Sequence, residues 1–193
     1  MVKQAGDAAR APMAIVVMGV SGTGKSTLGA LLADRLGAPF LEGDTFHSPA
    51  NVAKMAAGAP LTDDDRWPWL DRLGAALGDA ARGQGAAVAA CSALRRAYRE
   101  RLAAAAGLPL RFVFLDTDRA EIAHRMRARS DHYMPASLLD SQLATLERPG
   151  TDEPALRLEA SEPPATLAQR AGDWLERFEQ PSWRAHATPS PVS

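Results

Sequence analysis

The chain has 193 residues, of which 46% are hydrophobic and 23% charged; this is ordinary for a globular domain and excludes a wholly disordered chain. Lys and Arg number 22 against 23 Asp and Glu, so the net charge of −1 offers no broad basic surface for nucleic acid or an anionic membrane. The single cysteine, Cys91, excludes an intramolecular disulfide and a cysteine-based zinc site, and it fits a reducing compartment.

The two ends of the chain are expected to lie outside the folded domain. Residues 1–12 lack hydrophobic periodicity and residues 181–193 are rich in Pro and Ser, so both are expected to be disordered. The apolar run at 13–18 is too short to span a membrane and is not followed by a cleavage site, so we expect a cytoplasmic protein. One domain over residues 13–180 is therefore predicted.

Short apolar runs alternate with helical patterns along this domain. The predicted strands are 14–19, 39–42, 86–91, 111–116 and 155–159. The predicted helices are 25–36, 50–57, 67–82, 94–106, 119–129, 137–147 and 165–178. Such alternation predicts an α/β fold with a five-stranded parallel sheet, helices on both faces and right-handed crossovers.

The first predicted strand runs into the pattern Gly19-x-x-x-x-Gly24-Lys25-Ser26 and then into a helix, which is the context of a phosphate-binding loop. Glycines let the backbone turn so that amide groups face phosphate oxygens. The lysine brings a cation to the β- and γ-phosphates, and the serine hydroxyl can bind Mg²⁺. The sequence therefore predicts a bound nucleoside triphosphate, contacted by Gly19, Val20, Ser21, Gly22, Thr23, Gly24, Lys25, Ser26 and Thr27, with Ser26 as the metal ligand.

Other phosphate-loop classes fit less well. No Asn-Lys-x-Asp element is present, so a GTPase is not indicated. The third strand ends in Ala90-Cys91-Ser92, without the carboxylate that often holds magnesium at this place. We therefore expect Mg²⁺ to rest on Ser26, phosphates and water, with Glu42 or Asp44 assisting through water.

Asp44 follows the short second strand, 19 positions after Lys25. The carboxyl ends of parallel strands meet at one edge of the sheet, so this carboxylate is expected to face the phosphate loop. There it can accept a proton from an attacking hydroxyl and orient that hydroxyl toward the γ-phosphate. The alternative is that Asp44 caps a helix over Thr45–Val52.

Cations are predicted on the same edge of the sheet. Arg95 and Arg99 are four residues apart and would share one face of a helix. With Lys54 and Arg66 they can receive a small anion, because guanidinium groups bind carboxylates through two hydrogen bonds; each taken alone is more ordinary as a surface charge. The acidic run at 63–65 favours a helix start there, capped by Thr62 or an Asp.

Arg125 and Arg129 are also four residues apart, at the end of a predicted helix. They can close over nucleotide phosphates and stabilise the transferred charge. The alternative is that they complement the dipole at the helix C-terminus. Cys91 is interpreted as a packing residue.

Together these motifs resemble the gluconokinase family of small phosphate-loop carbohydrate kinases, over residues 13–178. The resemblance rests on the phosphate loop and on a series of more specific blocks: Glu42-Gly-Asp44-Thr-Phe-His47, Asn51-Val-Ala-Lys54-Met55, Asp63-Asp-Asp65-Arg66-Trp-Pro68-Trp69-Leu70, Cys91-Ser92-Ala93-Leu94-Arg95, Tyr98-Arg99, His132-Tyr-Met-Pro135 and Leu138-Leu-Asp-Ser-Gln142. Arg95 departs from the family pattern, in which lysine is frequent at this place, and this changes the donor geometry.

The resemblance implies transfer of the γ-phosphoryl group of ATP to the terminal hydroxyl of D-gluconate. It also implies a nucleoside-monophosphate-kinase-like fold with strand order 2-3-1-4-5, a substrate-side insertion at about 47–66, a lid at about 130–136 and a homodimer. Asp44 becomes the hydroxyl-orienting residue and Arg125 and Arg129 the lid residues. The implied substrate-binding set is Asp44, His47, Lys54, Arg66, Arg95, Arg99 and His132.

Two alternatives remain at this point. One is a related kinase for another hydroxy acid such as shikimate. The other is a nucleotide-binding regulator that transfers no phosphoryl group, which the presence of Asp44 disfavours.

Overall fold

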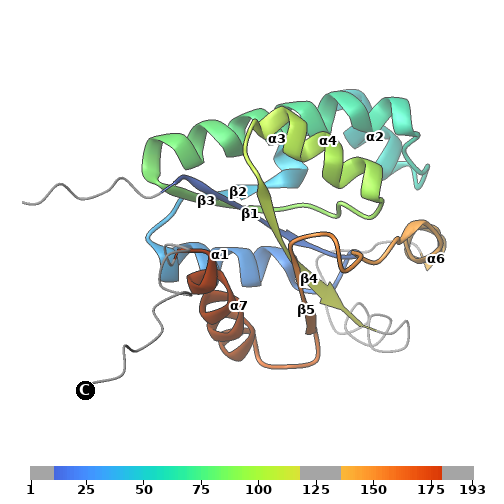
Figure 1. Ribbon diagram of the computed structural model, residues 1–193. Helices are drawn as coiled ribbons and strands as arrows, with labels where there is room; N and C mark the ends of the chain where they lie inside the picture. Colours follow the sequence, from blue (N-terminus) through green and yellow to red (C-terminus); the bar gives the residue numbers. More distant parts are fainter. Residues whose placement is uncertain (1–10, 118–135, 180–193) are drawn as a thin grey trace, which may run out of the picture.

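A five-stranded parallel sheet forms the centre of the molecule, in the order β2-β3-β1-β4-β5 (Figure 1). The computed structural model describes residues 11–117 and 136–179. The strands are β1 (Met13–Met18), β2 (Phe40–Glu42), β3 (Ala86–Ala90), β4 (Leu110–Asp116) and β5 (Ala155–Glu159). In the central strand, Val16 lies opposite Ala89 of β3 and Phe112 of β4. The predicted fold class and strand order are confirmed.

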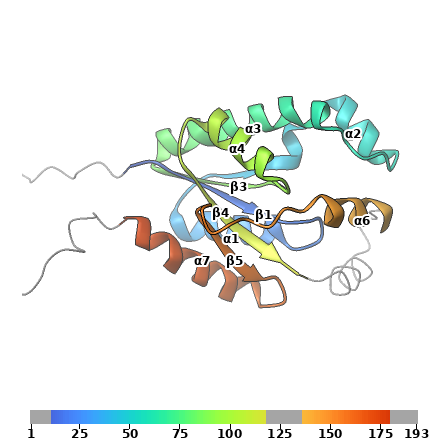
Figure 2. The same cartoon turned by 45° about the vertical axis from the view of Figure 1, so that its right-hand side comes forward.

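Helices cover both faces of the sheet, as Figure 2 shows. Their bounds are α1 (Lys25–Leu36), α2 (Pro49–Ala56), α3 (Asp63–Gln84), α4 (Arg96–Ala106), α6 (Ala136–Thr145) and α7 (Pro164–Glu179), and a short 3₁₀ helix, η1, spans Gly43–Phe46. The predicted helix 119–129, the lid, most of the N-terminal arm and the C-terminal tail lie outside the described residues.

The side chains of β1 alternate between two apolar layers. Val16 and Met18 pack with α3 and α4, whereas Ile15 and Val17 pack with α1 and α7. Both faces of the strand are therefore buried, which explains why its sequence is an unbroken apolar run and not an alternating one. In the part of the chain that the structure describes, no helix is long and apolar enough to cross a membrane.

Helix α3 begins four residues before the predicted start at Trp67. Thr62 is its N-cap: the Thr62 side chain accepts from the Asp65 amide, and the Asp65 carboxylate accepts from the Thr62 amide. This capping box satisfies amide groups of the first turn and starts the helix ahead of Pro68, which the helix then contains. The helix start predicted at the acidic run is confirmed, and the later one is wrong.

Helix α4 begins at Arg96, two residues after the predicted start at Leu94. Ala93 has a φ of 44°, and this left-handed turn breaks the backbone between β3 and α4. Arg95 is the N-cap and has extended dihedrals, φ −100° and ψ 151°. Arg95 therefore lies outside the helix, and the four-residue spacing does not place it on the same helical face as Arg99.

Candidate active site

The phosphate loop joins β1 to α1 and is held in a tight turn. Gly19, Gly22 and Gly24 all have positive φ values, of 140°, 83° and 96°. A side chain at Gly19 would place its Cβ 2.7 Å from the carbonyl oxygen of Leu115 on β4. The buried Thr23 hydroxyl donates to the Val20 carbonyl at 2.9 Å, which closes the loop on itself. The turn ends where α1 begins, so the positive end of the helix dipole adds to the loop amides.

Lys25 is half-buried at the base of this loop. Its ammonium donates to the Val20 carbonyl at 3.0 Å. Burial lowers the pKa of Lys25, while the charges of Asp44 and Glu42 act in the opposite direction. A partly desolvated cation beside open loop amides is a place for phosphate oxygens.

Asp44 lies in η1, directly after β2, with its carboxylate exposed. Its charge acts on both Lys25 and His47, so the structure brings it close to the phosphate loop. The side chain makes no hydrogen bond to any residue in the described part of the chain. The N-cap of α2 is Ser48, whose hydroxyl accepts from the Asn51 amide at 3.2 Å. The alternative that Asp44 caps this helix is therefore wrong.

The turn that carries Asp44 is fixed from below by Trp69. The indole nitrogen of Trp69 donates to the Gly43 carbonyl at 2.7 Å within the core. Gly43 is buried so tightly that an added Cβ would lie 2.2 Å from the Ala90 carbonyl oxygen. The His47 ring stacks on the Trp69 ring with centroids 4.1 Å apart. Burial lowers the pKa of His47. These contacts give the exposed carboxylate a rigid base.

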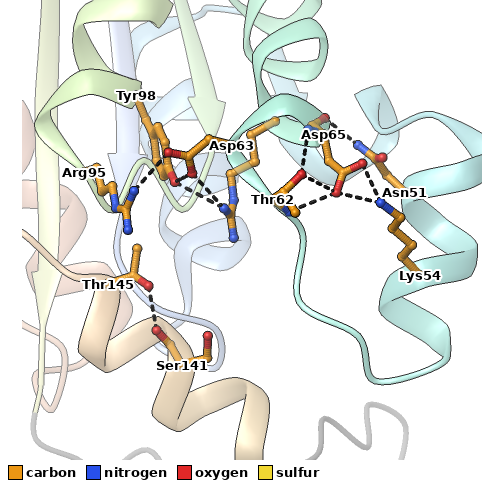
Figure 3. A network of polar contacts seen from close by, with 10 residues as sticks. Asn51, Lys54, Thr62, Asp63, Asp65, Arg95, Tyr98, Ser141 and Thr145 are labelled. Carbon is orange, nitrogen blue, oxygen red and sulfur yellow. Dashed lines mark hydrogen bonds and ion pairs between the residues drawn. The ribbon is translucent and has the colours of Figure 1, made fainter.

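The second part of the site is a cluster of charged and aromatic side chains that we call the Asp63 cluster: Asp63, Arg66, Arg95 and Tyr98. Figure 3 labels Asp63, Arg95 and Tyr98. Arg95 donates to Asp63 at 2.9 Å and Arg66 donates to Asp63 at 3.3 Å. The Tyr98 hydroxyl also donates to this carboxylate. The hydrogen bond from Tyr98, together with the two guanidinium groups, lowers the pKa of Asp63. The two arginines are thus held side by side by one shared anion.

Lys54 lies on the neighbouring helix, α2, and contacts the first turn of α3. Its ammonium donates to both carboxylate oxygens of Asp65, at 2.7 and 2.8 Å. Asn51 donates to the Asp65 carbonyl at 2.8 Å, so two residues of α2 bind the same acid residue (Figure 3). This pairing joins α2 to the first turn of α3.

Arg99 does not belong to this cluster, and its predicted role as a substrate contact is corrected. Its side chain is 2% exposed and donates to the Glu153 carboxylate, with one bond of 2.8 Å. It also donates to the carbonyls of Ala93 and Glu147, at 3.1 and 3.0 Å. These bonds use most of its donors, so Arg99 joins the β3–α4 turn to residues 147–153.

Cys91 is buried at the end of β3, where burial raises its pKa to about 12. A thiol of this kind stays protonated and packs in the core.

Arg125, Arg129 and His132, predicted at the nucleotide and the substrate, lie outside the described residues. The sequence predicts a helix start at Asp63 but neither its contacts with the two arginines nor the hydrogen bond of Trp69. Neither the motif around Gly43 nor the motif around Trp69 indicates that the Trp69 indole donates to the Gly43 carbonyl.

The phosphate loop, the strand order and the carboxylate beside the loop lysine define a phosphate-loop kinase. A family profile described as an AAA domain matches residues 15–149. The gluconokinase of Gluconobacter oxydans (strain 621H) is 53% identical over 158 residues, which cover 82% of this chain and 88% of that protein. The chain belongs to the gluconokinase family.

Two further comparisons agree with this assignment. The thermosensitive gluconokinase of Escherichia coli (strain K12) is 42% identical over 139 residues, covering 72% of this chain and 73% of that protein. The crystal structure of a gluconokinase from Sinorhizobium meliloti 1021 matches with a TM-score of 0.79 and 45% identity, over 88% of this chain and 95% of that chain. The described fold is thus the fold of a gluconokinase.

Proposed function

We propose that the protein transfers the γ-phosphoryl group of ATP to the terminal hydroxyl of D-gluconate and so forms 6-phospho-D-gluconate. The kinases named above support this substrate. The observation that carries the proposal is the position of Asp44: an exposed carboxylate without a hydrogen-bond partner in the described structure, near Lys25 and on a turn fixed by Trp69. A nucleotide-binding regulator would not need such a group.

In the proposed reaction the terminal hydroxyl of the acceptor donates a hydrogen bond to Asp44, which aligns its oxygen with the γ-phosphorus. The new phosphorus–oxygen bond forms as the bond to the β-phosphate bridging oxygen breaks, and the hydroxyl proton passes to Asp44. ADP leaves with the negative charge on its β-phosphate. Lys25 and the loop amides neutralise this charge, which is the main source of catalysis in phosphoryl transfer.

The acceptor carboxylate is proposed to bind Arg66 and Arg95. These side chains are 23% and 41% exposed, so both keep donors toward solvent while Asp63 holds them. Two neighbouring guanidinium groups suit a carboxylate, because each can donate hydrogen bonds to its oxygens. Lys54 and His47 are proposed to contact the hydroxyl groups of the acceptor. The Asp63 cluster would thereby distinguish a sugar acid from a neutral sugar.

Magnesium is proposed to bind the Ser26 hydroxyl and the phosphates, with water completing its coordination. Ser26 is exposed at the first turn of α1, where its hydroxyl can reach a metal on the phosphates. Among the described residues no three His, Cys, Asp or Glu side chains form a group that could hold a metal. The donor set thus fits Mg²⁺, which retains several waters and binds through substrate phosphates. When bound, the ion would neutralise charge on the phosphates.

Several further features remain predictions. Arg125 and Arg129 are proposed to bind the nucleotide phosphates and His132 the acceptor. The homodimer is proposed on the resemblance, and the cytoplasmic location on the short apolar run at 13–18, which no cleavage site follows. A single folded domain over residues 13–180 is proposed as well.

The test is an assay of ADP release with gluconate, shikimate and nucleoside monophosphates as acceptors. We expect turnover with gluconate and at most background release with the others. Turnover with shikimate and not gluconate would favour the related hydroxy-acid kinase. Titration calorimetry that shows ATP binding, together with no acceptor-dependent ADP release, would favour the regulator.

A further inference from the structure

Helix α6 contacts the phosphate loop through one polar side chain, Gln142. The backbone amide of Ser21 donates to the Gln142 side-chain oxygen at 2.7 Å, across 121 residues of sequence. Because the amide of Ser21 can only donate, the accepting atom must be Oε1, and this fixes the orientation of the Gln142 side chain. The Nε2 end, with two N–H groups, donates to none of the described residues.

This contact is held by an apolar cluster on the same face of α6. Leu139 and Leu143 pack with Val20 of the phosphate loop and with Leu94 of the β3–α4 turn. Leu139 and Gln142 are three residues apart, so they project from one side of the helix. The Glu147 amide, just beyond α6, donates to the Leu94 carbonyl at 2.8 Å. Gln142 therefore sits on a helix that is packed against both the phosphate loop and the turn that leads to Arg95.

Ser21 lies within the phosphate loop, so the Gln142 side-chain amide that is bonded to Ser21 lies beside the proposed nucleotide site. One end of the Gln142 side chain is occupied by the loop, and the other carries two unused donors. Donors aimed at the phosphoryl group stabilise the charge on its oxygens during transfer. Lys25 reaches this place from the phosphate loop itself, and Gln142 comes from a different element, α6.

We infer that Gln142 is a further catalytic residue: its Oε1 stays on the Ser21 amide, and its Nε2 donates to the γ-phosphoryl group as that group moves to the acceptor. This inference rests on the proposed phosphoryl transfer. Gln142 neither gains nor loses an atom in the step. The bond from phosphorus to the ADP oxygen breaks, the bond to the acceptor oxygen forms, and the hydroxyl proton goes to Asp44.

Substitutions can distinguish the role of the Oε1 acceptor of Gln142 from the role of its Nε2 donors. Gln142→Ala removes both the acceptor and the donors. Gln142→Glu keeps an acceptor for the Ser21 amide but has no donor while its carboxylate is ionised. Ala144→Gln is the matched control, because it adds the same amide at an exposed position of α6. All variants are measured as the full-length chain for kcat, for KM of ATP and gluconate, for ADP affinity by calorimetry and for Tm.

We expect kcat of Gln142→Ala to fall about 10²-fold, which is the loss when one transition-state donor is removed. ADP affinity should stay within about threefold, because ADP lacks the group that Gln142 contacts. Gln142→Glu should lose at least as much near neutral pH, and its kcat relative to the unsubstituted protein should rise as the pH falls and the carboxyl regains a proton. Ala144→Gln should keep the original kcat.

A purely structural role predicts a different pattern. If Gln142→Glu kept the original kcat at neutral pH, the Ser21 contact alone would matter and the inference would fail. It would also fail if Gln142→Ala lowered Tm but left kcat unchanged. The same variants are assayed for ATP hydrolysis without acceptor, in which water receives the same phosphoryl group. A chain that hydrolyses ATP but ignores gluconate would refute the proposed acceptor, and the hydrolysis rates would still decide the role of Gln142.

Discussion

Arg95 and Arg99 are four residues apart in the sequence, yet they belong to two regions with different physical character. Arg95 is 41% exposed, shares Asp63 with Arg66 and keeps donors toward solvent. Arg99 is 2% exposed, and its guanidinium is bonded to Glu153 and to backbone carbonyls. The first region is open to a ligand, and the second is closed by the protein's own groups.

The difference shows which arginine serves which purpose: a cation paired inside the protein contributes to stability, and a cation with donors toward solvent can bind a ligand. A buried ion pair that loses one partner leaves an uncompensated charge, and this costs several kcal/mol. A half-exposed cation is solvated whether or not a ligand is bound. Substitution of such a residue therefore affects ligand binding more than folding. The same contrast sets Lys25 and Asp44, which face the open edge of the sheet, apart from the Arg99–Glu153 pair.

The largest effect is expected at the open edge of the sheet. Asp44→Asn should lower kcat by about 10²–10⁴-fold, because the amide cannot accept the hydroxyl proton. Its Tm should hardly change, since Asp44 has no hydrogen-bond partner among the described residues. Steady-state kinetics and thermal unfolding of the same preparation check both statements. A variant with reduced stability but normal turnover per folded molecule would contradict the assigned role.

The opposite pattern is expected in the closed region. Arg99→Met should destabilise the fold by about 3–5 kcal/mol, because Glu153 is then left with a buried charge. Turnover per folded molecule should change little. Urea unfolding measures the free energy. The matched control is Arg101→Met on the same helix, whose exposed pair with Asp71 should contribute far less to stability. Equal losses in the two variants would remove the distinction drawn above.

A smaller effect on binding is expected at Arg95. Arg95→Met should raise KM for gluconate about tenfold or more, as expected for a lost hydrogen bond to a charged group, while the free energy of unfolding shifts by less than about 1 kcal/mol. Arg95→Lys, which keeps the charge but not the two-pronged geometry, should recover part of the affinity. An unchanged KM in Arg95→Met would place the acceptor carboxylate elsewhere.

The smallest effect concerns acid. The hydrogen bond from Lys54, followed by those from Thr62, lowers the pKa of Asp65 from 3.8 to about 2. A carboxyl whose pKa is lower in the folded state stabilises the protein above its unfolded pKa, and this contribution is lost as the pH falls from about 4 through 2. The stability difference between the unsubstituted protein and Asp65→Asn should therefore shrink over this range in urea titrations. A difference that is constant from pH 6 to 2 would show that the pairing has no effect on folding.

The fold could be predicted from the sequence because its signals are local. Apolar runs such as 13–18 and the glycines of the phosphate loop specify strands and a turn without reference to distant residues. Helix α3 was expected to start at Trp67 as well as at the acids, and only the capping box at Thr62 decides between the two. Element boundaries depend on such single hydrogen bonds.

The site was less accessible to prediction, because it depends on contacts between distant segments. The face shared by Arg95 and Arg99 was inferred from helical spacing, and the extended backbone of Arg95 removes that premise. Nothing in the spacing of Trp69 or Gln142 indicates that one bonds the Gly43 carbonyl and the other the Ser21 amide. These pairings follow from how the elements pack.

The hydrogen bond between Trp69 and Gly43 has a consequence for the length of acceptor that the site selects. Trp69 and Arg66 are three residues apart on α3, so the turn bearing Asp44 and one arm of the arginine pair are attached to a single rigid rod. If α3 moves, the turn of Asp44 and the side chain of Arg66 move with it, so the distance between them is preserved. If Asp44 and Arg66 bind the acceptor as proposed, this helix would fix the distance between the two, and so the length of acceptor that fits between its acid group and its terminal hydroxyl.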